Sequence, residues 1–449
     1  MRKLSTSNEK KKGKGNLTFE LNDKPQIKYM IPLSMQHVLL FLASIIAVPL
    51  MIGNSIGFTD SDTALLVQCG ILASGIGTIL QCFGLGPIGN RLPIILGSTF
   101  IFVTPCIVIS QTYGFPAFIG ASLICAIICA FIGVKCIKYI KKLFPPIVMG
   151  CVIMVIGLAL VNTAVNYCAG GTGSATYGHR ENYLLAFITL LIVVLLNVLG
   201  KGFIKAASVL IAMVIGFIIA VCMGMVDFAG LDEVGWFSIP KPFHFGIEFK
   251  PAAILIVGIL YLVEMVEFVG DTSTVTQIAA NREPNEEDLS RGILCDNVAS
   301  AIAAIFNTIP NVSYSGNIGL MGVTGVKSRY VVGVAGIMIT VLGFIPKLAT
   351  FLSLTPAPVI GGATLVIFGT IATSGLEILI RAKPSEREKL IIAVSLAIGL
   401  GFKFTPEALK DYPFYISTLV SGIPGTAISG ILLSALIPKE QKAEVEEQS

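Results

Sequence analysis

Three carboxylates follow one another at helical spacing inside a long apolar stretch. Glu264, Glu267 and Asp271 lie three and four residues apart in AAILIVGILYLVEMVEFVGDTSTV, so a helix places them on one stripe. An ionised acid at the bilayer centre costs about 2.5–3.5 kcal/mol, so this stripe must face protein or water. Burial favours the protonated carboxyl, which suits a proton-coupled site, and Glu267 is the strongest candidate. Asp271 has the alternative of capping the helix end or pairing with a basic side chain.

A polar, glycine-rich stretch follows at 311–329, NVSYSGNIGLMGVTGVKSR. Backbone inside a bilayer must be hydrogen-bonded within its own segment, and a broken helix is tolerated where it lines a cavity, which in transporters is the substrate site. We expect a half-helix to begin near Tyr314-Ser315-Gly316-Asn317, because Gly316 and Gly319 let backbone approach a ligand and its first amides are free donors. Asn317 either holds this bend by bonding backbone or touches substrate.

The segment Gly97-Ser98-Thr99-Phe100 lies at the matching place in the first half of the chain. If it is also a half-helix, the two amino termini converge on one site. A flat ligand between them would stack on Phe100 and bond to backbone amides. The alternative for Phe100 is lipid contact or core packing.

Other polar residues interrupt the apolar runs at Gln36-His37 and Asp296-Asn297. His37 is suited to relay protons near neutral pH, although a hydrogen bond that locks its helix, with Gln36 in support, is the favoured interpretation. Asp296 either bonds across to the broken helix or stands at a cytosolic helix start, so we assign it an indirect structural role. The sequence has no Walker motif, and no Ser-His-Asp or metal-ligand arrangement stands out, so we expect no enzyme activity, cofactor, metal or nucleic acid.

Composition indicates the class of protein. The 449 residues are 54% hydrophobic and 13% charged, whereas soluble proteins carry about 25% charged residues. A spanning helix needs about 20 apolar residues, so the sequence predicts an all-α polytopic membrane protein. Its ten cysteines lie mostly in apolar runs and are interpreted as packing residues. Fourteen segments are expected near 31–52, 63–83, 93–111, 115–134, 146–167, 182–200, 205–226, 251–270, 292–309, 314–325, 330–351, 357–380, 389–404 and 415–437.

The distribution of basic residues predicts the orientation. If the amino terminus is cytosolic, 25 of the 31 Lys and Arg residues fall on the cytosolic side, as the positive-inside rule requires. Both termini are then cytosolic. Residues 1–28, which hold eight Lys or Arg and no signal-peptide core, are expected to form a disordered basic tail.

An internal repeat relates the two halves of the chain. Pro146, Gly150 and Gly157 recur with the same spacing 212 residues later as Pro358, Gly362 and Gly369. The two sets fall in the fifth and twelfth segments, and a repeat of seven segments must be inverted in the membrane. Inverted repeats are typical of secondary transporters, with the site near the midplane between them. The alternative is coincidence, since Gly and Pro are common in membrane helices.

These ordered features resemble the nucleobase–ascorbate transporter family, also called nucleobase:cation symporter-2. The resemblance runs from Gln36-His37 through Gly97–Phe100, Glu267-Phe268-Val269-Gly270-Asp271 and Asp296 to Asn317-Ile318-Gly319 and Thr324-Gly325-Val326-Lys327-Ser328-Arg329. Asp271 and the TGVKSR ending look more like the xanthine and uric acid branch than the uracil branch, which tends to carry His at the place of Asp271.

The resemblance implies two inverted sets of seven segments, half-helices in segments 3 and 10, and a core domain that slides against a gate domain. The implied ranges are a basic tail at 1–28, core at 29–143 and 249–353, gate at 144–248 and 354–437, and a cytosolic tail at 438–449. It also implies a homodimer in the cell membrane. Glu267 would bind the base ring, and Asp271 would make a second polar contact.

One position departs from the family pattern. The residue before Asn317 is usually Gln in xanthine and uric acid members and Glu in uracil members, and here it is Gly316. Either the substrate differs, or a water replaces the side chain, or Ser315 or Tyr314 substitutes for it. We therefore expect proton-coupled import of a purine of the xanthine or uric acid class. The alternatives are uracil or another heterocycle, sodium coupling and, remotely, an anion pathway in the same fold.

Overall fold

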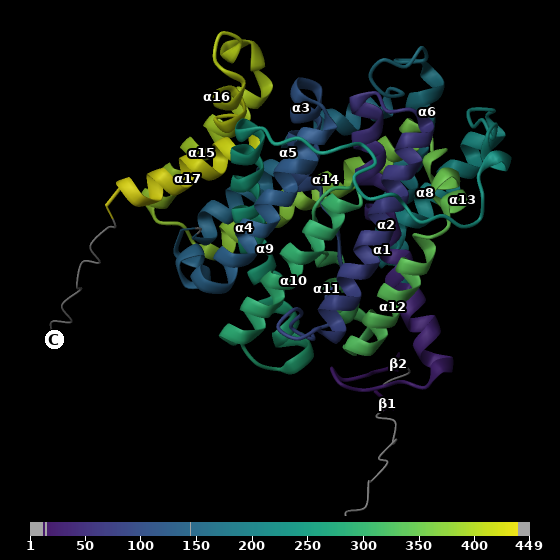
Figure 1. Cartoon of the computed structure of the whole chain (residues 1–449), viewed down its shortest axis with the longest axis horizontal. Helices are drawn as coiled ribbons and strands as arrows, with labels where there is room; N and C mark the ends of the chain where they lie inside the picture. The colour runs from purple at the N-terminus through teal and green to yellow at the C-terminus, as the bar shows by residue number, and fades with distance from the viewer. Residues whose placement is uncertain (1–11, 14–15, 144, 439–449) are drawn as a thin grey trace, which may run out of the picture.

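The computed structural model describes residues 12–13, 16–143 and 145–438, and it is mainly helical (Figure 1). Of the predicted carboxyl-terminal tail, only Pro438 lies within the described residues. The elements are β1 (Lys12–Gly13), β2 (Asn16–Leu17), α1 (Ile27–Ile56), α2 (Asp60–Phe83), β3 (Leu96–Ser98), η1 (Phe100–Phe102), α3 (Val103–Tyr113), α4 (Phe115–Leu143), α5 (Pro146–Cys168), α6 (Arg180–Leu199), α7 (Phe203–Ala206), α8 (Ser208–Cys222), η2 (Leu231–Glu233), α9 (Pro251–Ala280), α10 (Glu286–Ile305), β4 (Asn311–Ser313), α11 (Ser315–Thr324), α12 (Arg329–Leu342), α13 (Pro346–Ser353), α14 (Ala357–Ala382), α15 (Glu386–Phe404), η3 (Pro406–Leu409), α16 (Phe414–Leu419) and α17 (Gly422–Leu436).

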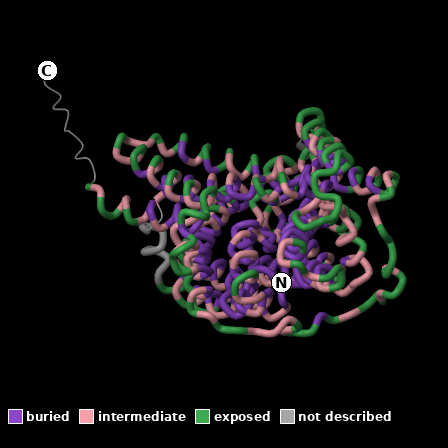
Figure 2. The backbone as a smooth tube through the Cα atoms, turned by 90° about the horizontal axis from the view of Figure 1, so that it is seen from above, coloured by how far each residue is buried: buried purple, intermediate pink, exposed green. Residues whose placement is uncertain are grey.

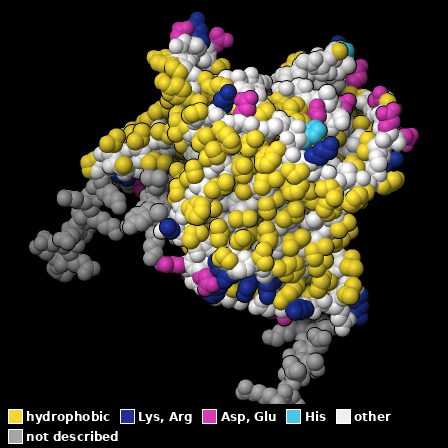
Figure 3. Space-filling view, viewed as in Figure 1, with side chains coloured by type: hydrophobic (Ala, Val, Ile, Leu, Met, Phe, Trp, Pro, Cys, Tyr) yellow, Lys and Arg dark blue, Asp and Glu magenta, His cyan; other side chains and the backbone are white. Residues whose placement is uncertain are grey.

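The described helices include seven that are long and apolar enough to span a bilayer. An eighth is added if α12 and α13, which are bent by 86° relative to each other, count as one span. Hydrophobic side chains form a broad band across the molecule between two charged rims (Figure 3). The remaining predicted segments correspond to shorter or more polar helices such as α3, α8 and α17, so the count of fourteen stays a prediction.

The helices pack in two groups. Helices α1–α4 pack mainly against α9, α10 and α12, and α5 packs mainly against α14, α15 and α17, while α6 packs against α14, α7 and α8. We call these the core helices and the gate helices, after the predicted domains in which they fall. Most buried residues lie in the interior of the packed helices, and exposed residues lie toward the outside (Figure 2). The mechanical roles of the two groups remain a proposal.

The two repeat glycines of α5 lie against α14, whereas those of α14 do not lie against α5. A Cβ on Gly157 would come within 2.5 Å of the backbone of Phe368 and Ala372, and one on Gly150 within 2.7 Å of Leu379. Small residues let two helix backbones approach closely in a membrane. The corresponding helices of the two halves are therefore pressed together at these glycines.

Two short strands, one from each half of the chain, pair with each other. β3 pairs with β4 in antiparallel register, with Leu96 opposite Ser313 and Ser98 opposite Asn311. η1 and α3 continue from β3, and α11 continues from β4. Both segments for which the sequence predicts an interrupted helix thus consist of an extended stretch followed by helix.

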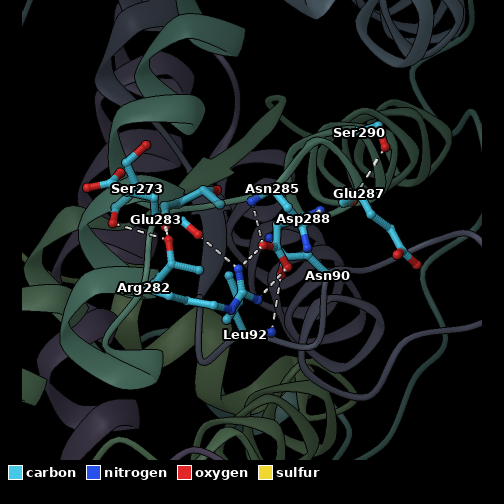
Figure 4. A network of polar contacts seen from close by, with 11 residues as sticks. Asn90, Leu92, Ser273, Arg282, Glu283, Asn285, Glu287, Asp288 and Ser290 are labelled. Atoms are coloured by element: carbon cyan, nitrogen blue, oxygen red, sulfur yellow. Dashed lines mark hydrogen bonds and ion pairs between the residues drawn. The ribbon is translucent and has the colours of Figure 1, made fainter.

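The connection between α9 and α10 is closed by a compact polar network (Figure 4). Asn285 and Asp288 form a capping box at the start of α10, and Asp288 also forms an ion pair with Arg282. The hydrogen bond from Arg282 Nη2 to Asp288 Oδ1 is 3.0 Å long, and this bonding raises the pKa of the Arg282 guanidinium. Because α10 begins at Glu286, Asp296 lies in mid-helix, and the alternative that it stands at a helix start was wrong.

The last third of the predicted amino-terminal tail is ordered, which corrects the expectation of disorder up to residue 28. Phe19 donates its N–H to the carbonyl of Gly325 and accepts from the N–H of Lys327. Ser328 Oγ donates to the carbonyl of Asp23 over 2.6 Å. The TGVKSR segment supplies backbone groups for this pairing, so it holds the residues that lead into α1.

Candidate functional site

A cavity of about 620 Å³ lies between the core and gate helices. Its core wall comes from α1, from residues 97–101, from Glu267 and from β4 with α11. Its gate wall comes from α5, from the α6–α8 region and from α14. This volume is in the range of small-molecule sites, and both interrupted segments contribute to its lining.

The helix starts at this cavity offer backbone donors. Tyr314 is the N-cap of α11, and its side chain makes no capping hydrogen bond. The N–H of Asn317 donates to the carbonyl of Tyr314 over 3.0 Å. The preceding amides, of Ser315 and Gly316, have no partner inside their own helix, and both residues line the cavity. At the other segment, Thr99 Oγ1 accepts from the N–H of Ile101 over 3.3 Å. The start of α11 therefore lacks the side-chain cap that Thr99 provides at the other helix start.

The three carboxylates of α9 have different surroundings. Glu267 is half-buried and is the one acidic side chain among the described residues that line the cavity. Glu264, one turn earlier, is 1% exposed, and both of its oxygens lack a hydrogen-bond partner in the described structure. Glu267 is thus the carboxylate available to a ligand.

Asp271 is one step removed from the cavity. It accepts hydrogen bonds from Ser313 Oγ over 2.7 Å and from Ser315 Oγ over 3.0 Å. Both serines line the cavity, and Asp271 does not. Its carboxylate holds β4 and the start of α11, and the direct ligand contact expected for Asp271 stays a prediction.

His37 and Asn317 lie behind the lining in the same way. His37 is 1% exposed, and its Nδ1 is hydrogen-bonded to Asn317 Oδ1. Asn317 Nδ2 donates to the carbonyl of Pro93 over 2.9 Å. Asn317 thereby connects α11 to α1 and to the residues that lead into β3. This geometry favours the structural interpretation of both residues over proton relay by His37 and substrate contact by Asn317.

We expect His37→Ala to destabilise the protein by about 1–2 kcal/mol, because Asn317 Oδ1 is left without its buried partner. Thermal unfolding of the purified protein in detergent measures the change. His37→Gln keeps an amide donor and should recover most of the stability, and His179→Ala, at an exposed site, should have no effect. Loss of proton coupling in a stable His37→Gln protein would instead identify His37 as a proton carrier.

Aromatic rings line two sides of the cavity. Phe100 is 8% exposed and meets Phe368 of α14 edge-on, with ring centroids 5.1 Å apart. Phe41 of α1 packs against Tyr314 with centroids 5.0 Å apart. Phe100, Phe41 and Tyr314 all contribute to the lining, and Tyr314 is the most exposed of the three.

Gly316 is covered by the ring of Tyr314. A Cβ at position 316 would lie 2.6 Å from Cζ and 2.7 Å from the hydroxyl oxygen of Tyr314, closer than any real contact. Tyr314 therefore occupies the space that a longer residue at 316 would need, and its hydroxyl lies beside that position.

The remaining predicted support residues lie outside the cavity lining. Asp296 is 1% exposed, lacks a hydrogen-bond partner in the described structure, and lies next to Glu264. The bond to the broken helix considered for Asp296 is therefore not present among the described residues. Thr324 Oγ1 donates to the carbonyl of Leu320 and accepts from the N–H of Val326 at the end of α11. Gln36 is half-buried on α1.

Sequence reasoning missed Phe41 and Lys205 as cavity residues. Phe41 is an ordinary apolar residue in an apolar run, so nothing in its sequence context distinguishes it. Lys205 entered the sequence argument only as one of the basic residues that set the orientation. Its place on the cavity depends on how α7 packs against α11.

Comparisons with known proteins agree with this architecture. The profile described as the permease family matches residues 28–408. A uric acid permease, PucJ, of Bacillus subtilis is 38% identical over 93% of this chain and 94% of its own length. The xanthine permease of the same organism is 36% identical over 93% of this chain and 96% of its own.

Solved structures of similar fold are more distant in sequence. The transmembrane domain of the cyanobacterial bicarbonate transporter BicA matches with a TM-score of 0.56 and 15% identity, over 89% of this chain and 97% of that one. The murine anion transporter Slc26a9 matches with a TM-score of 0.65 and 12% identity, over 92% and 69%. At these identities the likeness concerns the fold alone. The sequence matches decide the family: the chain belongs to the nucleobase–ascorbate transporter family, and it is a multi-pass membrane permease rather than an enzyme.

Proposed function

We propose that this permease imports a purine nucleobase of the xanthine or uric acid class together with protons. The observation that carries the proposal is the cavity, where one carboxylate, Glu267, and the uncapped start of α11 line the same space. The xanthine and uric acid permeases among the relatives support the choice of substrate. A carboxylate accepts hydrogen bonds from ring N–H groups, and backbone amides donate to ring carbonyls.

In the proposed complex, Glu267 binds the N–H edge of the ring and the first amides of α11 bind a carbonyl oxygen. Phe100 and Tyr314 contact the ring faces. Asp271 acts as a positioning residue, because it holds the hydroxyls of Ser313 and Ser315. A proton on Glu267 would balance the transfer of this buried charge across the membrane.

The position of the cavity between two helix groups favours elevator-type alternating access, in which the core helices slide along the gate helices with the substrate. Basic side chains gather at the rim near the amino-terminal strands (Figure 3), which supports cytosolic termini. The proposal includes a homodimer in the cell membrane.

Two variants of this function remain as alternatives. Gly316 is compatible with uracil or another heterocycle, because Tyr314 instead of a longer residue 316 would then select the ring. The second alternative is that sodium, instead of a proton, is the ion coupled to transport. An anion channel is the remote alternative, and it is disfavoured because an ionised Glu267 lines the cavity and repels any anion that no basic side chain compensates.

Uptake of radiolabelled xanthine and urate in cells that lack their own purine permeases tests the proposal. We expect saturable accumulation that collapses with a protonophore and does not respond to removal of sodium. A panel of unlabelled purines and pyrimidines in competition then ranks the substrates. Failure of every purine and pyrimidine to compete, or conductance without saturation, would reject it.

A further inference from the structure

The gate wall of the cavity carries one basic side chain. Lys205 lies in α7, and it is the one Lys or Arg among the described lining residues, as Glu267 is the one acid. The two come from opposite walls, since Glu267 belongs to a core helix. In the predicted topology α7 follows a cytosolic connection, so Lys205 lies toward the cytosolic end of the cavity.

Three other polar side chains on this wall, those of Asn197, Thr370 and Ser374, donate hydrogen bonds within the protein. Asn197 Nδ2 donates to the carbonyl of Val193 over 3.0 Å and to Ser208 Oγ over 2.7 Å. Thr370 Oγ1 and Ser374 Oγ donate to carbonyls of their own helix over 2.8 and 3.0 Å. The exposed ammonium of Lys205, by contrast, has no hydrogen bond or ion pair within the described part of the chain.

We propose that Lys205 binds the anionic, oxygen-bearing edge of the substrate at the cytosolic end of the cavity and selects oxopurine anions over neutral bases. The inference rests on the proposed function and names the form of substrate that this site prefers. An ammonium is a compact point charge with three donors, and its hydrogen bonds to an anionic oxygen are stronger than neutral ones.

The electrostatics of the cavity support this assignment. With Glu267 alone, an ionised site would repel an anionic ring. Lys205 on the facing wall supplies the compensating charge, so the pair can hold an anion without net charge on the lining. Lys205 belongs to the gate helices and Glu267 to the core helices. Lys205 would therefore contact a substrate bound at Glu267 only when the core helices have carried the cavity to the cytosolic side.

The test uses the full-length transporter in inside-out membrane vesicles, which present the cytosolic end to the medium. Urate serves as the anionic probe, and xanthine at pH 6 serves as a largely neutral one. Lys205→Gln removes the charge, Lys205→Arg keeps it, and Lys205→Glu reverses it. Lys201→Gln is the matched control, because Lys201 is exposed in the same connection but does not line the cavity.

We expect Lys205→Gln to raise the KM for urate about tenfold, in line with the loss of one hydrogen bond to a charged group, and to change the KM for xanthine less than twofold. Lys205→Glu should be worse for urate, and Lys205→Arg should approach the wild type, as should Lys201→Gln. An unchanged KM for urate in Lys205→Gln, or an equal change for both probes, overturns the inference. Failure of the wild type to transport either probe overturns the proposed function instead.

Discussion

Glu267→Gln should abolish the accumulation of purine in energised cells. Glutamine keeps one acceptor oxygen, but it cannot ionise and cannot carry a proton. Loss of a charged hydrogen-bond partner at a desolvated contact costs roughly 2–5 kcal/mol, so we expect kcat/KM to fall by about a hundredfold or more. Initial rates of xanthine and urate uptake measure the loss, and the amount of transporter in the membrane is determined in parallel.

Glu264→Gln is the matched control for this experiment. It makes the same chemical change one turn earlier on α9, at a side chain that is buried and outside the cavity lining. Its neighbour Asp296 can bond to an amide without needing a proton between two carboxyls. We expect uptake within about threefold of the wild type. The reverse result, accumulation retained in Glu267→Gln and lost in Glu264→Gln, would place the coupling proton on the Glu264–Asp296 pair and refute the role given to Glu267.

The carboxylate stripe shows how far the sequence leads. Helical spacing places Glu264, Glu267 and Asp271 on one face of α9, but the residues that cover each carboxylate come from other parts of the chain. The hydroxyls of Ser313 and Ser315, more than forty residues away, donate hydrogen bonds to the Asp271 carboxylate. Spacing alone therefore predicts which face of α9 carries the carboxylates. It does not predict which of the three a ligand would contact.

At the two interrupted segments, too, the sequence predicts one part of the structure and distant contacts determine the rest. Glycine and polar residues in an apolar chain predict that regular helix fails near Gly97 and Gly316. The form of the break depends on pairing between β3 and β4, which joins residues more than two hundred positions apart. The amino-terminal segment was expected to be disordered because it is polar and basic, yet the free backbone groups of residues 325–329 give it partners.

Gly316→Gln should lower purine transport about 10- to 100-fold. The added Cβ would lie 2.6 Å from the Tyr314 ring, and that ring cannot yield easily because Phe41 packs against it. Phe41 is itself confined, since a Cβ on Gly97 would come within 2.0 Å of its ring. Overpacking of this kind typically costs about 1–3 kcal/mol, and here the displaced ring belongs to the cavity lining.

Two further variants separate a steric cause from a chemical one. Gly319→Ala is the control, because Gly319 also lines the cavity on α11 and a Cβ there has nothing within 4 Å, so uptake should stay within about twofold. Tyr314→Ala combined with Gly316→Gln removes the clash and offers the amide to the ring, and we expect it to recover xanthine uptake relative to Gly316→Gln alone. If Gly316→Gln by itself gained xanthine transport over the wild type, Tyr314 would not be filling that space in the working protein, and the native site would be built for a different heterocycle.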